Sequence, residues 1–164
     1  MILGLSLSTF TFVHVVISLI GIVTGLVVVF GMLGAKRPGG LTAVFLATTV
    51  LTSLTGFLFP FHGLLPSHVV GIISLVVLAA ALFALYGNHL AGPWRWIYVA
   101  GAVAALYLNV FVGVVQAFQK LAFLQPFAPT QSEPPFIVAQ ALVLAIFVAL
   151  GFLGVKRFHP GSAA

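Results

Sequence analysis

Long apolar stretches follow one another along almost the whole chain, and short segments rich in proline, glycine and charge separate them. A helix that crosses the roughly 30 Å hydrocarbon core of a bilayer needs about 20 apolar residues. Five stretches reach that length, and they predict membrane-spanning helices over residues 8–34, 41–59, 67–87, 94–119 and 135–155. We therefore expect residues 1–164 to form a single all-α domain, an integral membrane bundle of five transmembrane helices.

The composition supports a surface that faces lipid. Hydrophobic residues make up 62% of the chain and charged residues 4%, with a mean hydropathy of +1.30. Soluble domains carry about 25% charged residues, so a soluble fold is excluded and the lipid bilayer is the expected partner. The net charge of +5 comes from cations that stand singly or in pairs beside apolar stretches. That spacing does not indicate nucleic-acid binding.

The basic residues predict the orientation of the chain. With five crossings, five of the six Lys and Arg fall on one side: Lys36, Arg37, Arg95, Lys156 and Arg157. Cytoplasmic loops carry the excess of Lys and Arg, so we expect the N-terminus outside and the C-terminus in the cytoplasm. Residues 1–35 hold no Lys or Arg, and the first apolar stretch is about twice as long as that of a signal peptide. It is expected to be a retained span.

Small and polar residues mark faces within the first two spans. His14, Ser18, Gly21 and Gly25 share one face of the first, and the GxxxG spacing of the two glycines allows close approach of another helix. That helix could belong to a second copy, giving a homo-oligomer through Gly21 and Gly25, or to the same bundle, which we favour. The second span is rich in Ser and Thr, whose hydroxyls we expect to bond to carbonyls four residues earlier or to neighbouring helices.

The fourth span carries a stripe of small and polar residues, with Asn109 near the middle of the membrane. An unpaired amide there would cost several kcal/mol, so Asn109 must face other helices. We expect it to bond to a group on another helix, such as a hydroxyl of the second span. Whether it binds a ligand or only joins two helices stays open at this point.

Polar residues near the expected outer side form the main candidate ligand-binding site. They come from four spans and from the loop before the fifth: His14, His68, Gln116, Gln140 and Glu133. Ionisable and amide groups inside a membrane are costly to leave facing hydrocarbon, so convergence on one outward-facing pocket is expected. His14 would form its floor, with His68 and Glu133 at its rim. The alternative is structural: Glu133 caps the fifth helix, and His14 bonds to a neighbouring helix.

Several segments carry a resemblance to a known family. They are FVH at 12–14, TSLTGF at 52–57, PSHVVGIISL at 66–75, WRWIY at 94–98 and APTQSEPP at 128–135. Together they resemble segments of small, functionally uncharacterised bacterial integral membrane proteins, over nearly the whole chain. The resemblance implies a multi-pass protein of the bacterial cytoplasmic (inner) membrane. It brings no activity and no assigned site.

Three classes of function remain open. The first is a non-enzymatic membrane protein whose pocket binds a small ligand, a lipid headgroup or a partner subunit. The second is a redox subunit in which His14 and His68, the candidate metal ligands, hold a b-type haem or a quinone. The third is a small oligomeric transporter, for which His14 would be the only titrating group inside the spans.

The sequence supports an enzymatic function less well than these three classes. The chain has no Asp and no Cys, and Glu133 has no carboxylate partner for acid/base work. No phosphate-binding loop and no metalloprotease or CxxC motif is present. An enzyme is therefore the less favoured expectation, and no cofactor is expected beyond the haem or quinone of the redox alternative.

Overall fold

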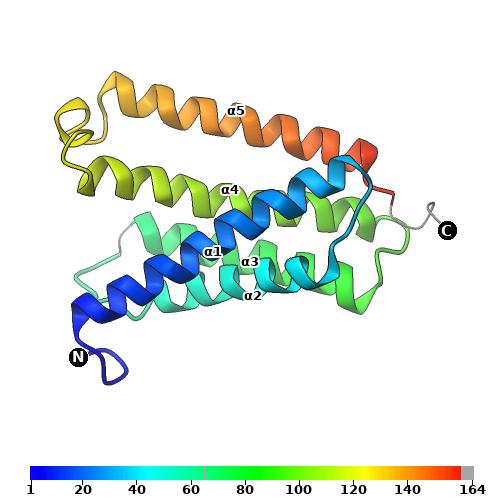
Figure 1. The fold of residues 1–164 in the computed structure, drawn as a ribbon, viewed down its shortest axis with the longest axis horizontal. Helices are drawn as coiled ribbons and strands as arrows, with labels where there is room; N and C mark the ends of the chain where they lie inside the picture. Colours follow the sequence, from blue (N-terminus) through cyan, green and yellow to red (C-terminus); the bar gives the residue numbers. More distant parts are fainter. Residues whose placement is uncertain (65, 160–164) are drawn as a thin grey trace.

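The chain folds into five long helices. The computed structural model describes residues 1–64 and 66–159, and no strand is found among them. The helices are α1 (Leu7–Leu33), α2 (Gly39–Gly56), α3 (Pro66–Leu82), α4 (Trp94–Lys120) and α5 (Pro134–Arg157). A π-helical turn, η1 (Phe83–Gly87), extends α3, and a 3-10 turn, η2 (Gln125–Phe127), lies between α4 and α5. All five, with α3 counted together with η1, are long and apolar enough to span a membrane (Figure 1).

The predicted boundaries hold to within two residues except at the end of the second helix. That helix was expected to reach Phe59, but α2 ends at Gly56 and the chain turns at Phe57. The residue before a proline is disfavoured in the helical conformation, so Pro60 forces Phe59 out of the helix and the end recedes by a turn. At the start of α1, Ser6 is the N-cap, and its side-chain oxygen accepts a hydrogen bond from the amide of Thr9.

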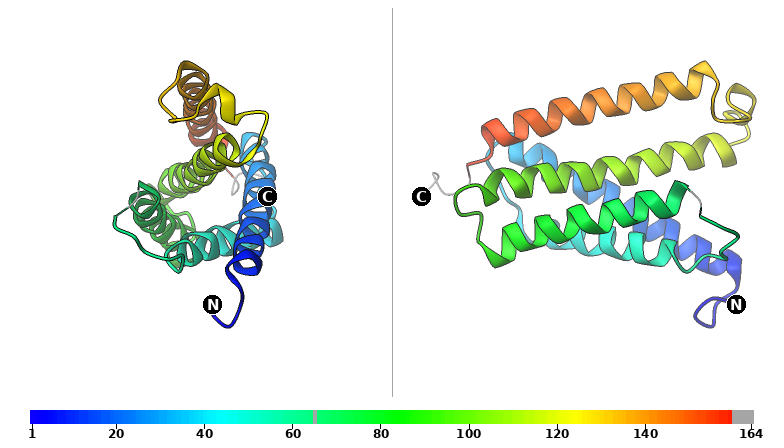
Figure 2. Two further views of the ribbon diagram at one scale, coloured as in Figure 1. Left: turned by 90° about the vertical axis from the view of Figure 1, so that its left-hand side faces the viewer. Right: turned by 180° about the vertical axis from the view of Figure 1, so that it is seen from behind.

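Helix α4 occupies the middle of the bundle. It contacts α1, α2, α3 and α5, whereas α5 packs mainly on α4 and touches α1 (Figure 2). The buried core runs along α4 and includes Val99, Leu106 and Ala102, packed against Phe45 of α2 and Leu78 of α3. Helix α5 buries Phe147 and Leu150, and most of its other large side chains are exposed, as expected for a helix that contacts lipid.

The two glycines of the GxxxG spacing are used within the chain. A Cβ at Gly25 would lie 2.7 Å from side-chain atoms of Leu106 and Phe45, and one at Gly21 would lie 3.2 Å from the hydroxyl oxygens of Thr48 and Thr49. Both glycines are buried, and they let α1 cross close to α2 and α4. The two glycines therefore serve packing within one chain, which was the favoured interpretation of their spacing. A homo-oligomer would need another surface.

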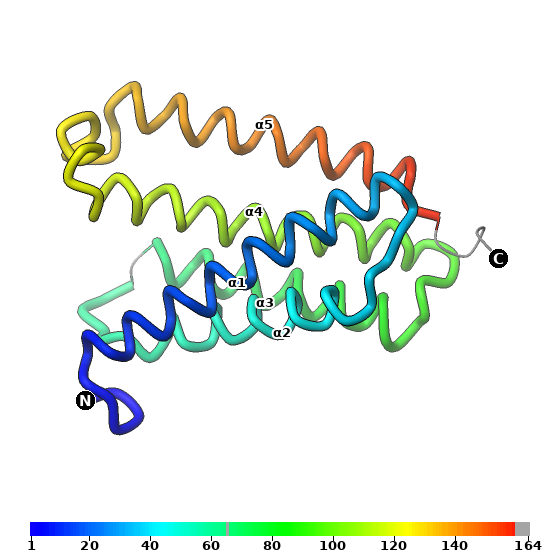
Figure 3. The backbone as a smooth tube through the Cα atoms, viewed as in Figure 1, coloured from blue at the N-terminus to red at the C-terminus, as the bar shows by residue number. Residues whose placement is uncertain are grey.

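The helices alternate in direction, which gives the bundle two distinct ends. The N-terminus, the α2–α3 loop and the α4–α5 loop lie at one end, called here the amino-terminal end (Figure 3). The α1–α2 loop, the start of α4 and the end of α5 lie at the other. This second end, called the basic end, carries Lys36, Arg37, Arg95, Lys156 and Arg157. The five cations thus share one end, and the orientation in the membrane stays a prediction.

Candidate functional site

His14 joins α1 to α2 near the amino-terminal end. Its Nδ1 lies 2.7 Å from the hydroxyl oxygen of Thr55, and its ring packs edge-on against Phe59 with centroids 5.1 Å apart. The Thr55 hydroxyl already donates its one hydrogen to the Leu51 carbonyl at 2.6 Å. Nδ1 of His14 must therefore be the donor, which assigns the ring the tautomer with its proton on Nδ1.

Asn109 joins α4 to α1. The Ser18 hydroxyl donates to Oδ1 of Asn109 at 2.9 Å, and Nδ2 of Asn109 donates to the Ser18 carbonyl at 3.4 Å. Asn109 is only 8% exposed, so the prediction that it faces the bundle interior is confirmed. Its partner lies on α1 rather than on α2, where the hydroxyls of Thr48 and Thr49 donate to carbonyls of their own helix and so have no hydrogen for Oδ1 of Asn109.

Two other predicted site residues lie on α4 and α5. The Gln140 amide nitrogen donates to the Phe111 carbonyl of α4 at 3.1 Å, and its Oε1 is buried without a hydrogen-bond partner. Gln116 is exposed. Within the described part of the chain, no hydrogen bond joins His14, Gln116 and Gln140 to one another. His14, Asn109 and Gln140 each form a hydrogen bond to a neighbouring helix instead. Hydrogen bonding therefore does not bring the predicted site residues together in one pocket.

The two candidate axial histidines approach the same segment from different helices. His14 of α1 packs on Phe59, whereas His68 of α3 is buried and packs against Phe57 and Phe61, with centroids 5.8 and 5.1 Å apart. Bis-histidine ligation requires both imidazoles to face one iron. Here the two imidazole rings pack against phenylalanines of the segment after α2, His14 against Phe59 and His68 against Phe57 and Phe61. No group of three or more His, Asp or Glu able to hold a metal ion occurs in the described ranges.

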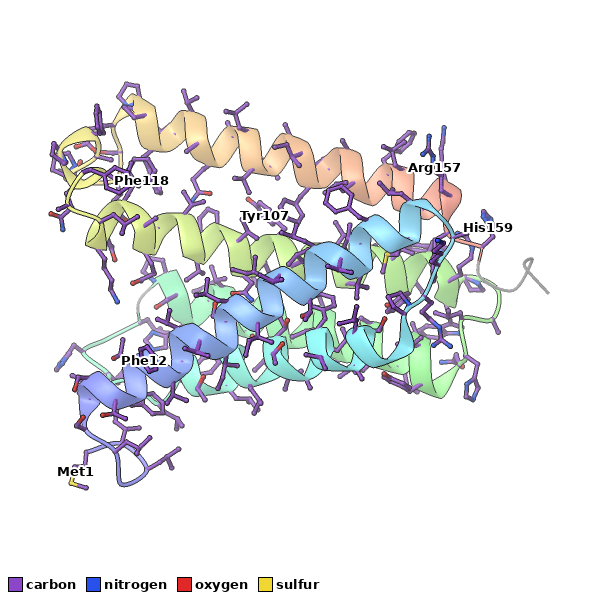
Figure 4. The ribbon with its side chains drawn as sticks, viewed as in Figure 1. Met1, Phe12, Tyr107, Phe118, Arg157 and His159 are labelled. Atoms are coloured by element: carbon purple, nitrogen blue, oxygen red, sulfur yellow. The ribbon has the colours of Figure 1, made fainter. Side chains whose placement is uncertain are left out.

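A pocket of about 400 Å³ lies at the amino-terminal end, between the end of α4 and the α4–α5 loop. It is lined by uncharged residues: Phe118, Gln119, Gln125, Ala128, Pro129, Thr130 and Gln131. Figure 4 labels Phe118 beside this loop, at the end of the bundle opposite to Arg157. Three amide side chains and one hydroxyl thus surround the space together with an apolar wall.

The amides around this pocket hold one another in place. Gln119 donates to Oε1 of Gln131 at 3.2 Å, Gln131 donates to the Val115 carbonyl at 3.1 Å, and Gln125 donates to the Gln119 carbonyl at 2.5 Å. Gln131 has a φ of 60°, in the left-handed region, which costs a residue with a Cβ about 1–2 kcal/mol. Strain of this kind persists where the surrounding contacts fix the backbone, and it is concentrated at functional sites.

Glu133 lies directly after the residues that line the pocket. Its carboxylate accepts hydrogen bonds from the hydroxyl of Thr130 at 2.7 Å and from the backbone amides of Thr130 and Ser132 at 3.1 Å. The Thr130 hydroxyl, followed by these amides, lowers the pKa of Glu133 below its ordinary value. Glu133 is the N-cap of α5 by position, but its side chain does not cap the helix, as it turns back into the loop.

Gln119, Gln125, Gln131 and Thr130, which line this pocket, were not among the residues predicted to form a site. A signal was present, because all five glutamines of the chain fall between residues 116 and 140. Comparisons with family models, with curated proteins and with solved structures found no match to this chain.

Proposed function

We propose that this protein binds a small, uncharged, hydrogen-bonding ligand in the α4–α5 pocket, outside a bacterial cytoplasmic membrane, without changing the ligand chemically. The observation that carries the proposal is the lining of the pocket: three glutamines and a threonine, and no charged side chain. A volume of about 400 Å³ falls within the range of small-molecule sites. Five candidate spans support a multi-pass membrane protein, with the pocket end outside by the distribution of Lys and Arg.

The chemistry of the lining favours a polyol, sugar or amide. Each Gln side chain offers both a donor and an acceptor, and apolar residues such as Phe118 and Pro129 provide a flat wall for the carbon skeleton. The charged side chain of the α4–α5 loop is Glu133, and its carboxylate already accepts hydrogen bonds from Thr130 and Ser132. A cationic ligand therefore gains little from it.

Binding without catalysis is supported by the groups around the pocket. General acid/base work needs a group that changes its protonation near neutral pH. Hydrogen bonds from Thr130 and Ser132 hold Glu133 in its ionised form, and the pocket lining contains no His, Lys or Arg. Glutamine amides bind and orient ligands, and they do not transfer protons at neutral pH.

The experiment is a ligand screen on the purified full chain in lipid nanodiscs. The probes are glycerol, glucose, N-acetylglucosamine and urea, with phosphate and choline as charged counterparts, and the readout is isothermal titration calorimetry. We expect at least one neutral probe to bind and the charged probes not to bind. Gln119→Leu and Gln131→Leu should abolish that binding. The matched control is Gln116→Leu, because Gln116 is an exposed glutamine of α4 outside the pocket lining.

Two results would contradict the proposal. One is the absence of binding for every neutral probe. The other is binding that Gln116→Leu and Gln131→Leu weaken equally, which would indicate an effect of the fold rather than of the pocket. Reporter fusions test the orientation separately: those after Arg37 and Arg95 should report the cytoplasm, and one near Thr130 should report the exterior.

A further inference from the structure

The two ends of the bundle differ sharply in charge. The basic end carries five of the six Lys and Arg of the chain, and the chain's only acidic side chain, Glu133, lies in the α4–α5 loop at the amino-terminal end. No acidic side chain is therefore available to neutralise the cations of the basic end. Cations at a bilayer surface that lack internal partners attract anionic lipid headgroups.

Among these five cations, Arg95 differs because its charged group donates hydrogen bonds within the described part of the chain. Its Nη1 donates to the carbonyls of Val155 and Phe158, both at 2.7 Å. The other four are exposed and form two pairs, Lys36–Arg37 directly after α1 and Lys156–Arg157 in the last turn of α5. These two pairs are the cations that remain for an external partner.

The two pairs lie on neighbouring helix ends. The last turns of α1 and α5 are side by side in every view, and the two helices contact each other (Figures 1 and 2). The Lys36 amide donates to the Gly31 carbonyl at 2.8 Å, which holds the first pair against the end of α1. In the second pair, Nζ of Lys156 lies 4.4 Å from the centroid of the Phe152 ring, so a cation–π contact keeps the ammonium beside the helix.

We propose that these two pairs form a site for a phospholipid that carries two phosphates, the chemistry of cardiolipin, with one phosphate at each pair. The guanidinium of each arginine suits a phosphate because it donates two parallel hydrogen bonds, and the neighbouring lysine adds a point charge. Basic sites between transmembrane helices are typical binding places for such headgroups. Exposed apolar side chains near the same helix ends, Phe30 of α1 (57%) and Phe152 of α5 (60%), offer contacts to acyl chains.

The test is lipid retention by the purified full chain, measured by native mass spectrometry. The added lipids are cardiolipin, phosphatidylglycerol and phosphatidylcholine, and a further arm adds inorganic phosphate as a competitor. We expect cardiolipin to be retained in preference to phosphatidylglycerol at equal total phosphate, and phosphatidylcholine not to be retained. Each cation near an anionic surface contributes about fivefold, so Lys36→Ala/Arg37→Ala and Lys156→Ala/Arg157→Ala should each weaken retention about 25-fold.

Matched variants separate the charge of the pairs from effects on folding. Lys120→Ala removes the one Lys or Arg outside the basic end and should leave retention unchanged. Lys36→Arg/Lys156→Arg keeps all four charges and should retain the lipid fully, whatever the alanine variants do to stability.

Three outcomes would overturn the proposal. The first is equal retention of cardiolipin and phosphatidylglycerol at equal phosphate, which would mean a diffuse surface effect. The second is a loss with Lys120→Ala as large as that of the pair variants. The third is displacement of cardiolipin by inorganic phosphate at equal concentration, which would identify a phosphate site that does not recognise lipid.

Discussion

Arg95 connects the start of α4 to the end of α5, and its replacement tests how the outermost helix is held. Nη1 donates to the Val155 and Phe158 carbonyls at 2.7 Å, which belong to the last turn and the C-cap of α5, where carbonyls lack partners within the helix. Phe158 is fully buried and packs against the ring of Tyr98. Arg95→Ala removes both hydrogen bonds and leaves two carbonyls that only water could satisfy.

The size of the effect follows from the charge of the donor. A hydrogen bond to a charged group contributes about 1.5–3 kcal/mol, and two bonds from one nitrogen are not additive. Water at the helix end replaces part of the loss, so we expect Arg95→Ala to reduce the local stability of the last turn by about 2–3 kcal/mol. Since 1.4 kcal/mol is a factor of ten, opening of this turn should become about 30–150 times more frequent.

Amide hydrogen exchange, followed by mass spectrometry, measures this opening. The Phe158 amide, which donates to the Gly154 carbonyl at 2.8 Å, is the reporter, and its exchange should accelerate by that factor in Arg95→Ala. Arg157→Ala is the matched control, because Arg157 lies in the same turn but is exposed. Its favourable interaction with the helix dipole gives an acceleration of about fivefold at most. If Arg95→Ala and Arg157→Ala change the exchange equally, Arg95 does not hold the end of α5.

Three further predictions concern the bundle and its loop. Ser18→Ala leaves Oδ1 of Asn109 buried without its donor, so the melting temperature should fall by an amount that corresponds to about 1–2 kcal/mol, and a fall no larger than that of Ser8→Ala on the exposed start of α1 would contradict the pairing. Gly25→Ala forces a Cβ to within 2.7 Å of two core side chains and should cost about 1–3 kcal/mol in thermal unfolding, whereas Gly40→Ala, with open space around it, should be neutral or slightly stabilising. The lowered pKa of Glu133 means that its contribution to loop stability is present above the ordinary carboxyl pKa and is lost as the pH falls through the lowered value; the protection of the Thr130 and Ser132 amides against hydrogen exchange, measured relative to the intrinsic rate at each pH, should fall over that acidic range, and this fall should be absent in Glu133→Gln.

The number and bounds of the helices could be predicted because they depend on local properties of the chain. A run of about 20 apolar residues spans a bilayer whatever it packs against, and prolines or charges end it. The inward direction of Asn109 was predictable for a similar reason, since a buried amide near mid-membrane has to be satisfied by protein. These inferences needed no knowledge of which helices are neighbours.

The partners of the polar groups could not be predicted, because they depend on how the helices cross. Gly21 and Gly25 bring α1 against α2 and α4, and this crossing puts His14 beside Thr55, 41 positions further along the chain. Depth in the membrane, which was the basis for grouping His14 with Gln116 and Gln140, does not specify rotation about each helix axis. The α4–α5 pocket escaped prediction because its lining comes from the end of α4 and from the loop, whose conformation has no hydrophobic periodicity to predict it.

The hydrogen bonds inside the bundle explain why both proposed sites lie at its ends. Thr55 is the partner of Nδ1 of His14, and Ser18 is the partner of the Asn109 amide, so both groups already take part in bonds between helices. Within the described residues, the buried polar atoms that lack a partner, such as Oε1 of Gln140, are closed to solvent. An incoming solute would have to break bonds between helices before it formed its own, at a cost of about 1–3 kcal/mol for each group left unpaired. At the ends, each glutamine of the pocket keeps a second amide hydrogen and further lone pairs beyond its bond within the loop, and the two basic pairs are exposed, so binding there leaves the packing of the helices intact.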